Sequence, residues 1–294
     1  MKQSFTFYLT HWVIKLKGLK KLFSEDPINF KKIQKEDVFK PKGSFFKRNI
    51  KRRFQVLKTE VTEVSHSDNS NKLIVFVHGG AFISGPAKHH WETIKTIVKA
   101  TDYTIWLCNY PKAPEHKIIE ISENIEAVYE QAIEEFDSEN IILLGDSVGG
   151  TLVTALTQRL IKNNKSLPKQ IQLVSPVMDA SLSNPDIDKY DVIDPMLSKK
   201  GIFSAKKMCA GDVSLKDPII SPIYGSFKGF PETILFLAEN DIMYPDGIVL
   251  KDILQKEKVK FKVIHGENMP HIWPFLPIMK ESSISLKQLI SLLN

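Results

Sequence analysis

The sequence predicts an α/β fold with a mostly parallel central sheet flanked by helices. Two observations lead to this prediction. Six short apolar runs recur along the chain, and helix-like stretches separate many of them, which is the pattern of a parallel sheet covered on both faces. The 294 residues are 43% hydrophobic and 25% charged, which are ordinary values for a globular chain. These values exclude a disordered chain, a collagen-like repeat and a protein with many membrane spans.

The apolar pattern of the expected strands differs between the start of the chain and its later part. Residues 54–65 alternate apolar and polar side chains, as an edge strand or a half-buried strand does, and the turn cluster at 67–71 suggests a hairpin. The later runs are continuously apolar, which is typical of strands buried on both faces. These runs are 72–78, 104–110, 140–146, 170–176, 233–239 and 259–265, and the expected helices are 90–100, 119–135, 149–163 and 246–256.

Positive charge is concentrated at the N-terminus. Residues 1–53 carry a net charge of +11 and residues 54–294 a net charge of −5. We therefore expect a basic N-terminal segment, 1–53, joined to one main domain, 54–294. Residues 180–230 break the strand–helix rhythm, with a short helical pattern at 199–210, and an insertion of this length is often a lid.

Residues 4–23 predict an amphipathic helix inside the basic segment. Its apolar residues recur every three or four positions with lysines between them, and the stretch is too short and too polar for a secretory signal or a membrane span. Two outcomes stay open: the apolar stripe packs on the protein's own body, or it makes peripheral contact with a membrane. The stripe consists of Phe5, Leu9, Trp12, Leu16, Leu19 and Phe23.

Several partner classes and compartments are disfavoured. No nucleic-acid-binding motif accompanies the basic residues, so we expect no nucleic-acid partner. Cys108 and Cys209 do not make a disulfide framework, and a cytoplasmic location is expected. No closely spaced Cys and His residues suggest zinc. Because His89 and His90 have no carboxylate pattern nearby in the sequence, we expect no metal and no cofactor.

The strongest motif is Gly145-Asp146-Ser147-Val148-Gly149-Gly150, which lies between an expected strand and an expected helix. Gly-x-Ser-x-Gly in this context is typical of a nucleophile elbow. The turn is so tight that a side chain at either flanking glycine would collide with the neighbouring chain, and the serine is forced into a strained conformation. Ser147 is therefore the predicted nucleophile.

A second motif, His78-Gly79-Gly80-Ala81-Phe82, follows the expected strand 72–78. Adjacent glycines let the backbone approach a substrate closely, and successive N–H groups can point at one oxygen. This is the requirement for an oxyanion hole. His78 is expected to hold the loop in shape by hydrogen bonding.

These two motifs, with Tyr110-Pro-Lys-Ala-Pro-Glu115-His between them, resemble the hormone-sensitive-lipase-type branch of the α/β-hydrolase superfamily. That branch contains many bacterial carboxylesterases, and the resemblance covers roughly residues 70–280, the extent of one α/β domain. It implies an α/β-hydrolase fold with a helical cap formed by residues 1–53 and an insertion at about 180–215. It also implies that the backbone N–H groups of Gly80, Ala81 and Val148 form the oxyanion hole, and that Glu115 and Asp146 are structural supports.

A serine nucleophile needs a base and an orienting acid, in the chain order Ser, acid, His for this fold. Two histidines, His265 and His271, follow Ser147, and the resemblance selects His271. It also selects Asp241, at the carboxyl end of an expected strand, with Asp179 as the alternative acid. Asp246 is expected as a family acid displaced by one position or as a helix N-cap. The remaining candidates, Asp137, Asp186, Asp188, Asp191 and Asp194, are interpreted as surface or turn residues.

The resulting hypothesis is a serine carboxylesterase that hydrolyses short- to medium-chain acyl esters through a Ser147–His271–Asp241 triad and an acyl-enzyme. Its partner is a small-molecule ester, and a homodimer is one option for its oligomeric state. The alternatives are an amidase or formamidase on the same scaffold and a non-catalytic binding protein of this fold. The residues expected to wall the acyl pocket are Phe82, Ile83, Met243 and Trp273.

Overall fold

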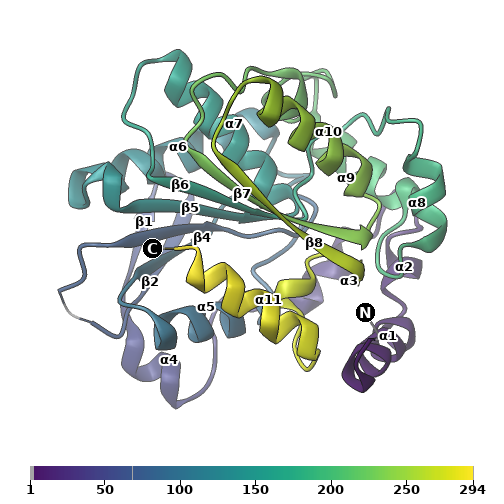
Figure 1. Ribbon diagram of the computed structural model, residues 1–294, viewed down its shortest axis with the longest axis horizontal. Helices are drawn as coiled ribbons and strands as arrows, with labels where there is room; N and C mark the ends of the chain where they lie inside the picture. The colour runs from purple at the N-terminus through teal and green to yellow at the C-terminus, as the bar shows by residue number, and fades with distance from the viewer. Residues whose placement is uncertain (1–2, 68, 294) are drawn as a thin grey trace.

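The computed structural model describes residues 3–67 and 69–293, and its centre is an eight-stranded sheet (Figure 1). The strand order is β1-β2-β4-β3-β5-β6-β7-β8. β1 and β2 pair antiparallel, β2 pairs antiparallel with β4, and all the other pairs are parallel. This confirms the predicted α/β-hydrolase fold. The strands are β1 Ile50–Val56, β2 Thr59–Val64, β3 Leu73–Val77, β4 Thr104–Asn109, β5 Ile141–Asp146, β6 Gln170–Val174, β7 Glu232–Asn240 and β8 Phe261–Pro270.

Helices cover both faces of the sheet, as expected. Side chains along β3 alternate between two core layers: Val75 and Val77 lie in one layer, and Ile74 and Phe76 in the other. α6 (Ile118–Glu135), α7 (Val148–Lys162) and α10 (Tyr244–Lys256) cover the first layer, and α5 (Lys88–Ala100) and α11 (Lys280–Ser291) the second (Figure 1). The four helices predicted between strands are confirmed.

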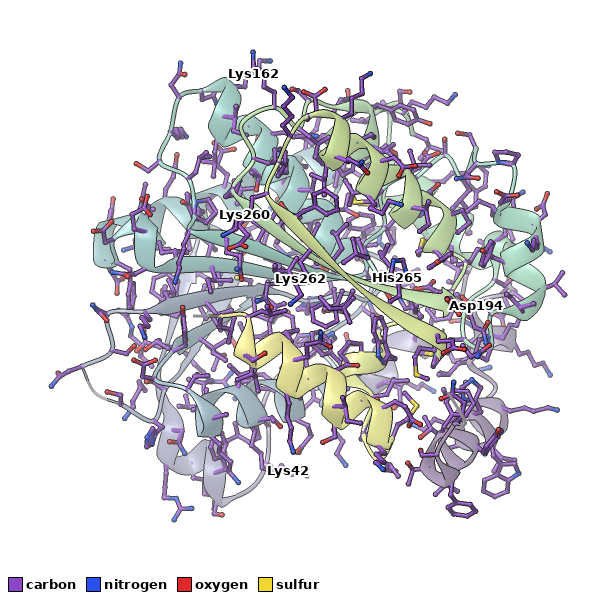
Figure 2. The ribbon with its side chains drawn as sticks, viewed as in Figure 1. Lys42, Lys162, Asp194, Lys260, Lys262 and His265 are labelled. Atoms are coloured by element: carbon purple, nitrogen blue, oxygen red, sulfur yellow. The ribbon has the colours of Figure 1, made fainter. Side chains whose placement is uncertain are left out.

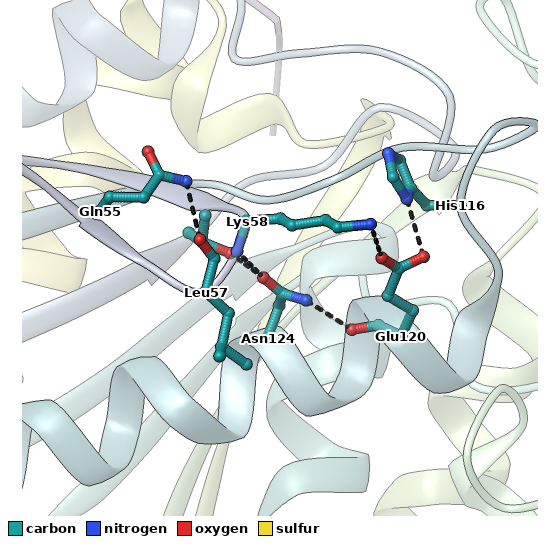
Figure 3. A network of polar contacts seen from close by, with 7 residues as sticks. Gln55, Leu57, Lys58, His116, Glu120 and Asn124 are labelled. Carbon is teal, nitrogen blue, oxygen red and sulfur yellow. Dashed lines mark hydrogen bonds and ion pairs between the residues drawn. The ribbon is translucent and has the colours of Figure 1, made fainter.

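The hairpin at the start of the sheet differs from the prediction. Residues 54–65 do not form one strand, because the chain turns at Leu57 and Lys58, and β1 pairs with β2. The turn is fastened to α6: the Asn124 side-chain oxygen accepts the Lys58 N–H at 2.8 Å and the Thr59 hydroxyl at 3.2 Å. Glu120 Oε1 forms an ion pair with Lys58 Nζ at 2.6 Å (Figure 3). The cluster at 67–71, of which residue 68 lies outside the described residues, precedes β3 and closes no hairpin.

The N-terminal segment divides into two parts. Its last residues belong to the sheet, because β1 begins at Ile50, so the predicted boundary at residue 53 was too late. α4 (Ser44–Asn49) packs beside α5, where the ring centres of Phe46 and Trp91 are 5.6 Å apart. Only the earlier helices, α1 (Phe5–Lys17), α2 (Leu19–Leu22) and α3 (Phe30–Ile33), lie near the carboxyl ends of the strands (Figure 1).

These early helices meet the insertion between β6 and β7. The insertion contains α8 (Ile187–Ile193) and α9 (Lys199–Ala210), so the predicted helical pattern at 199–210 is confirmed. Gly201 N–H donates to the Phe23 carbonyl at 2.9 Å, and Ile28 N–H donates to Ser204 Oγ at 3.0 Å. The two segments that the sequence assigns to a cap therefore contact each other directly.

The predicted apolar stripe is divided: Leu19 and Phe23 pack against the core, whereas Phe5, Trp12 and Leu16 are exposed. Phe7, Thr10 and Ile14 form the buried side of α1, whereas Phe5 and Trp12, which belong to the predicted stripe, are 82% and 59% exposed. The stripe also does not run through one helix, because α1 ends at Gly18, whose φ of +61° is left-handed. Among the residues that the structure describes, no helix is both long enough and apolar enough to cross a membrane.

Candidate active site

Ser147 lies at the tight turn between β5 and α7, as the motif predicts. Its backbone has φ +52° and ψ −123°, a strained conformation for a residue with a side chain. The glycines around it are required by close packing: a Cβ on Gly149 would overlap the carbonyl oxygen of Val77, and one on Gly145 would lie 2.6 Å from the Gly149 carbonyl carbon. The Ser147 N–H donates to the Val174 carbonyl at 2.9 Å, which ties the turn to β6.

His271 and Asp241 are brought together at the same edge of the sheet. Asp241 follows β7, and His271 follows β8. His271 Nδ1 lies 2.7 Å from Asp241 Oδ2, and both side chains are buried. The other carboxylate oxygen, Oδ1, accepts the Met243 N–H at 2.9 Å. Ile272 N–H donates to Ser175 Oγ at 3.0 Å, so the loop carrying His271 is anchored beside the strand end that also anchors Ser147.

The electrostatic environment of His271 favours its protonated form. Burial alone would lower the pKa of this histidine, but the charge of Asp241 and the hydrogen bond to it outweigh burial, and the net pKa is raised. Asp194 and Asp146 add smaller contributions in the same direction. A base with a raised pKa, held by a carboxylate in one orientation, is the arrangement that general-base catalysis by histidine requires.

Asp194 caps a turn, as one of the two interpretations expects, but it is not a surface residue. It is 1% exposed and it is close to the acid of the site: Asp194 Oδ2 accepts the Ile242 N–H at 2.9 Å, directly after Asp241 in the chain. Oδ1 accepts the N–H groups of Met196 and Leu197 at 2.7 and 2.8 Å. Burial, followed by the nearby charge of Asp241, raises the pKa of Asp194 to about 7.

The alternative acid and base lie elsewhere. The Asp179 carboxylate accepts hydrogen bonds from Ser181, Ser183 and Tyr224, and these fasten the start of the insertion. His265 is exposed on β8 (Figure 2), where its Nδ1 lies 3.5 Å from the Tyr244 hydroxyl.

Asp246 is not the N-cap of α10. It lies inside that helix, where its side chain accepts a hydrogen bond from Asn184 at 3.0 Å. Burial raises the pKa of Asp246 to about 6.

The His-Gly-Gly loop runs close to the serine turn. Gly80 and Ala81 have φ of +124° and +55°, and a Cβ on Gly80 would overlap the Ser84 carbonyl oxygen. Within the described residues, the N–H groups of Gly80, Ala81 and Val148 donate to no protein acceptor. His78 Nδ1 lies 2.6 Å from the Gly79 carbonyl oxygen, in agreement with its expected role in loop shape.

Asp146 supports this loop, as expected from the resemblance. Its Oδ1 accepts the Gly79 N–H at 3.0 Å, and it pairs with His90 Nε2 at 3.3 Å. Burial opposes the charge of Asp146, but the interactions with His90 and Gly79 hold its pKa below the usual range. Glu115, the other expected support, is exposed, so its predicted supporting role has no counterpart in the structure.

The sequence argument against a metal near His89 and His90 overlooked Asp146. Potential ligand atoms of these three residues lie within 4.8 Å of one another. However, His90 Nδ1 accepts the Ala87 N–H at 2.8 Å, so its Nε2 carries the proton that faces Asp146 and has no lone pair to offer a metal. The donor set does not fit a metal in this hydrogen-bonded arrangement.

The four residues expected to wall an acyl pocket are all buried, and they do not share one layer. Phe82, Ile83 and Met243 belong to the core layer covered by α6, α7 and α10. Trp273 belongs to the opposite layer, where its Nε1 donates to Ser285 Oγ on α11 at 2.8 Å. Trp273 therefore supports the loop after His271 from the side of the sheet that α11 covers. Its predicted place in the pocket wall was wrong.

Comparison with known proteins identifies the class. A family model described as the α/β-hydrolase fold matches residues 74–275. The chain belongs to this family and is a hydrolase, as the sequence predicts. A crystal structure of an esterase from the bacterial hormone-sensitive lipase family superposes with a TM-score of 0.86 at 21% identity, over 100% of this chain and 98% of that one. It has the same fold.

The individual relatives share less than 30% sequence identity with this chain, although the fold is closely similar. An esterase of Acinetobacter venetianus is 27% identical over 208 residues, which are 69% of either chain. A triacylglycerol lipase of Mycobacterium tuberculosis is 24% identical over 217 residues, 74% of this chain but 45% of the lipase. The crystal structure of a candidate esterase from Staphylococcus aureus is 28% identical, with a TM-score of 0.83 over 92% of this chain and 94% of that one.

Proposed function

We propose that the protein is a serine carboxylesterase in which Ser147 is the nucleophile, His271 the general base and Asp241 the orienting acid. The observation that carries the proposal is the buried 2.7 Å contact between His271 Nδ1 and Asp241 Oδ2, at the sheet edge where Ser147 occupies a strained turn. The esterases among its relatives support the choice of ester substrates.

In the proposed mechanism, neutral His271 keeps its proton on Nδ1 and donates a hydrogen bond from it to Asp241, so that Nε2 carries the lone pair. Nε2 takes the hydroxyl proton of Ser147 as Oγ attacks the ester carbonyl. The negative oxygen that forms is stabilised by the N–H groups of Gly80, Ala81 and Val148. His271 then protonates the leaving alcohol, and water, deprotonated by the same histidine, hydrolyses the acyl-enzyme.

We infer that residues 3–36, with α8 and α9, form a cap over this site and favour short- to medium-chain acyl groups. Ser147 is only 9% exposed and His271 4% exposed, so other parts of the chain cover both side chains. The cap segments are hydrogen-bonded to each other, which supports a fixed cover over a freely opening lid. A p-nitrophenyl ester series with kcat/KM highest at long acyl chains would contradict this inference.

The central test uses a short p-nitrophenyl ester and a fluorophosphonate probe that labels activated serines. Wild-type protein should turn over the ester and take up one label, and Ser147→Ala should do neither. His271→Ala should also be inactive, whereas His265→Ala, the matched exposed histidine, should keep wild-type activity. The proposal is wrong if folded wild-type protein neither hydrolyses the ester nor takes up the label. A panel of amides in the same assay separates an esterase from an amidase.

A further inference from the structure

One face of α1 exposes a row of large apolar side chains. Phe5, Tyr8, Trp12 and Leu16 are 82%, 60%, 59% and 65% exposed, and their spacing of three, four and four residues places them on one side of the helix. We call these four side chains the outer face. With aromatic side chains of 150–250 Å² each, it presents roughly 500 Å² of mostly apolar surface to solvent.

The opposite side of α1 is already occupied, so the outer face is not left over from a loosely attached helix. Phe7 and Ile14 are buried against the body. Ser4 is bonded to the Glu281 carboxylate on α11 by its N–H and its hydroxyl, both at 2.8 Å. These contacts hold the helix in one orientation, in which the outer face points away from the protein body.

Basic residues accompany the outer face. Residues 3–24 contain four lysines, Lys15, Lys17, Lys20 and Lys21, and no acidic residue. Lys15 and Lys21 are exposed, and Lys17 makes only a 3.9 Å contact with the exposed Glu36. Lys20 Nζ donates to the Asp191 and Asp194 carbonyls at the end of α8, which joins the α1–α2 segment to Val192, an apolar residue 80% exposed.

The location of this surface is also informative. α1, α2 and α8 lie at the end of the molecule toward which β7 and β8 run (Figure 1). Ser147, Asp241 and His271 follow the carboxyl ends of strands at that same end. A partner bound to the outer face would therefore lie at the same end of the molecule as the proposed active site.

We propose that the outer face binds the surface of an anionic phospholipid bilayer, with Phe5, Tyr8, Trp12 and Leu16 entering the interfacial region and the lysines contacting lipid headgroups. Aromatic side chains on one helix face flanked by lysines are what interfacial binding requires. This proposal is independent of the esterase chemistry, since it concerns binding alone.

A second copy of the chain fits this surface less well. An interface that pairs two outer faces would bring the two sets of lysines toward each other, and like charges facing each other weaken association. The exposed area is also below the approximately 800 Å² that each partner of a stable complex contributes. An anionic bilayer has neither difficulty, because its charge is opposite and its area is not limited.

The tryptophans provide a direct readout. Trp12 is exposed, whereas Trp91, Trp106 and Trp273 are at most 2% exposed. On addition of vesicles of phosphatidylcholine and phosphatidylglycerol in about a 3:1 ratio, we expect a blue shift of the emission and its quenching by brominated acyl chains. Trp12→Phe should still bind in sedimentation assays but lose both signals.

Variants separate the contributions to binding. Phe5→Ser combined with Trp12→Ser should lower the vesicle partition coefficient by about tenfold or more, and Lys15→Glu combined with Lys21→Glu should remove most of its salt dependence. The matched control is Leu57→Ser with Ile119→Ser, which removes two exposed apolar side chains, 65% and 50% exposed, from the hairpin turn and α6. It should bind like wild type, and circular dichroism and thermal melting verify that every variant is folded.

Three results would overturn the proposal. One is equal binding of wild type and the Phe5/Trp12 double variant to the anionic vesicles. Another is binding of wild type to pure phosphatidylcholine vesicles as strong as its binding to the anionic vesicles, which would show that lipid charge plays no part. The third is a lipid-free dimer that the Phe5/Trp12 variant dissociates, without vesicle binding by wild type, which would assign the outer face to a second copy.

Discussion

Replacing Asp241 with asparagine tests how this site orients its histidine. The substitution keeps the size of the side chain but removes its charge and one acceptor. Asp241 Oδ1 accepts the Met243 N–H at 2.9 Å, so the asparagine carbonyl oxygen should keep that position. Its NH₂ group must then face His271 Nδ1, which lies 2.7 Å from Oδ2 in wild type.

The consequence is a reversed tautomer. An NH₂ group donates to Nδ1, so the imidazole proton moves to Nε2, the atom that should accept the proton of Ser147. In Ser-His-Asp enzymes this error costs about 10⁴ in kcat, equivalent to about 5 kcal/mol in the activation free energy. The pKa of His271 should also fall, since the charge of Asp241 is the largest contribution that raises it.

The assay is hydrolysis of a short p-nitrophenyl ester by wild type, Asp241→Asn and Asp179→Asn. Asp179 is the matched control: it is also a buried carboxylate in a loop at the carboxyl end of the sheet, but its partners are hydroxyl and N–H groups of the insertion. Asp179→Asn should lose stability while kcat stays within about threefold of wild type. If Asp241→Asn keeps more than about a tenth of the activity, or if Asp179→Asn is the inactive variant, the assignment of the acid is wrong.

Three further predictions concern pH, the hairpin and the serine turn. Because the pKa of His271 is raised, kcat/KM should fall with decreasing pH at a midpoint above about 6.5. Asp194→Asn removes one of the charges that raise this pKa, so it should move the midpoint to lower pH in pH-stat assays. An upward shift of the midpoint would contradict the electrostatic argument. Asn124→Ala leaves two donors of the hairpin turn without their acceptor and should lower the free energy of unfolding in urea by about 1–3 kcal/mol, whereas no loss would mean that α6 does not hold the turn. Gly149→Ala should prevent folding, because the new Cβ would overlap the Val77 carbonyl. Gly18→Ala, where φ is +61° but the space is open, should lower the free energy of unfolding by only about 1–2 kcal/mol. Comparable unfolding curves for the two variants would refute the steric explanation.

The parts of the fold that were predictable are those determined by neighbouring residues in the chain. Continuous apolar runs indicate buried parallel strands, because both faces of such strands are covered, and β3 to β7 follow them closely. β8 differs: it was expected at 259–265 but runs from Phe261 to Pro270, and its side chains are not buried on both faces. The serine turn is similarly local: Gly145, Ser147 and Gly149 satisfy a steric requirement within five residues. His271 and Asp241 were predictable through the family resemblance, and the contact between them agrees with it.

Other features depend on contacts between distant segments. The hairpin turns at Leu57 and Lys58, which carry no turn signal of their own, because Asn124 from α6 binds the backbone there. The orientation of α1 was ambiguous, because both of its sides carry large apolar residues, with Phe7 and Ile14 inside and the outer face exposed. Periodicity alone cannot decide which of two apolar sides a helix buries.

Asp194 shows how such a distant contact can alter the chemistry of the proposed site. It comes from the insertion, yet it binds the backbone beside Asp241 and contributes to the raised pKa of His271. Burial and the charge of Asp241 raise the pKa of Asp194, so its contribution to the field at His271 weakens as the pH falls. The acid limb of the activity profile should therefore depend on Asp194 as well as on His271. The insertion thus supplies part of the field that raises the pKa of the proposed base.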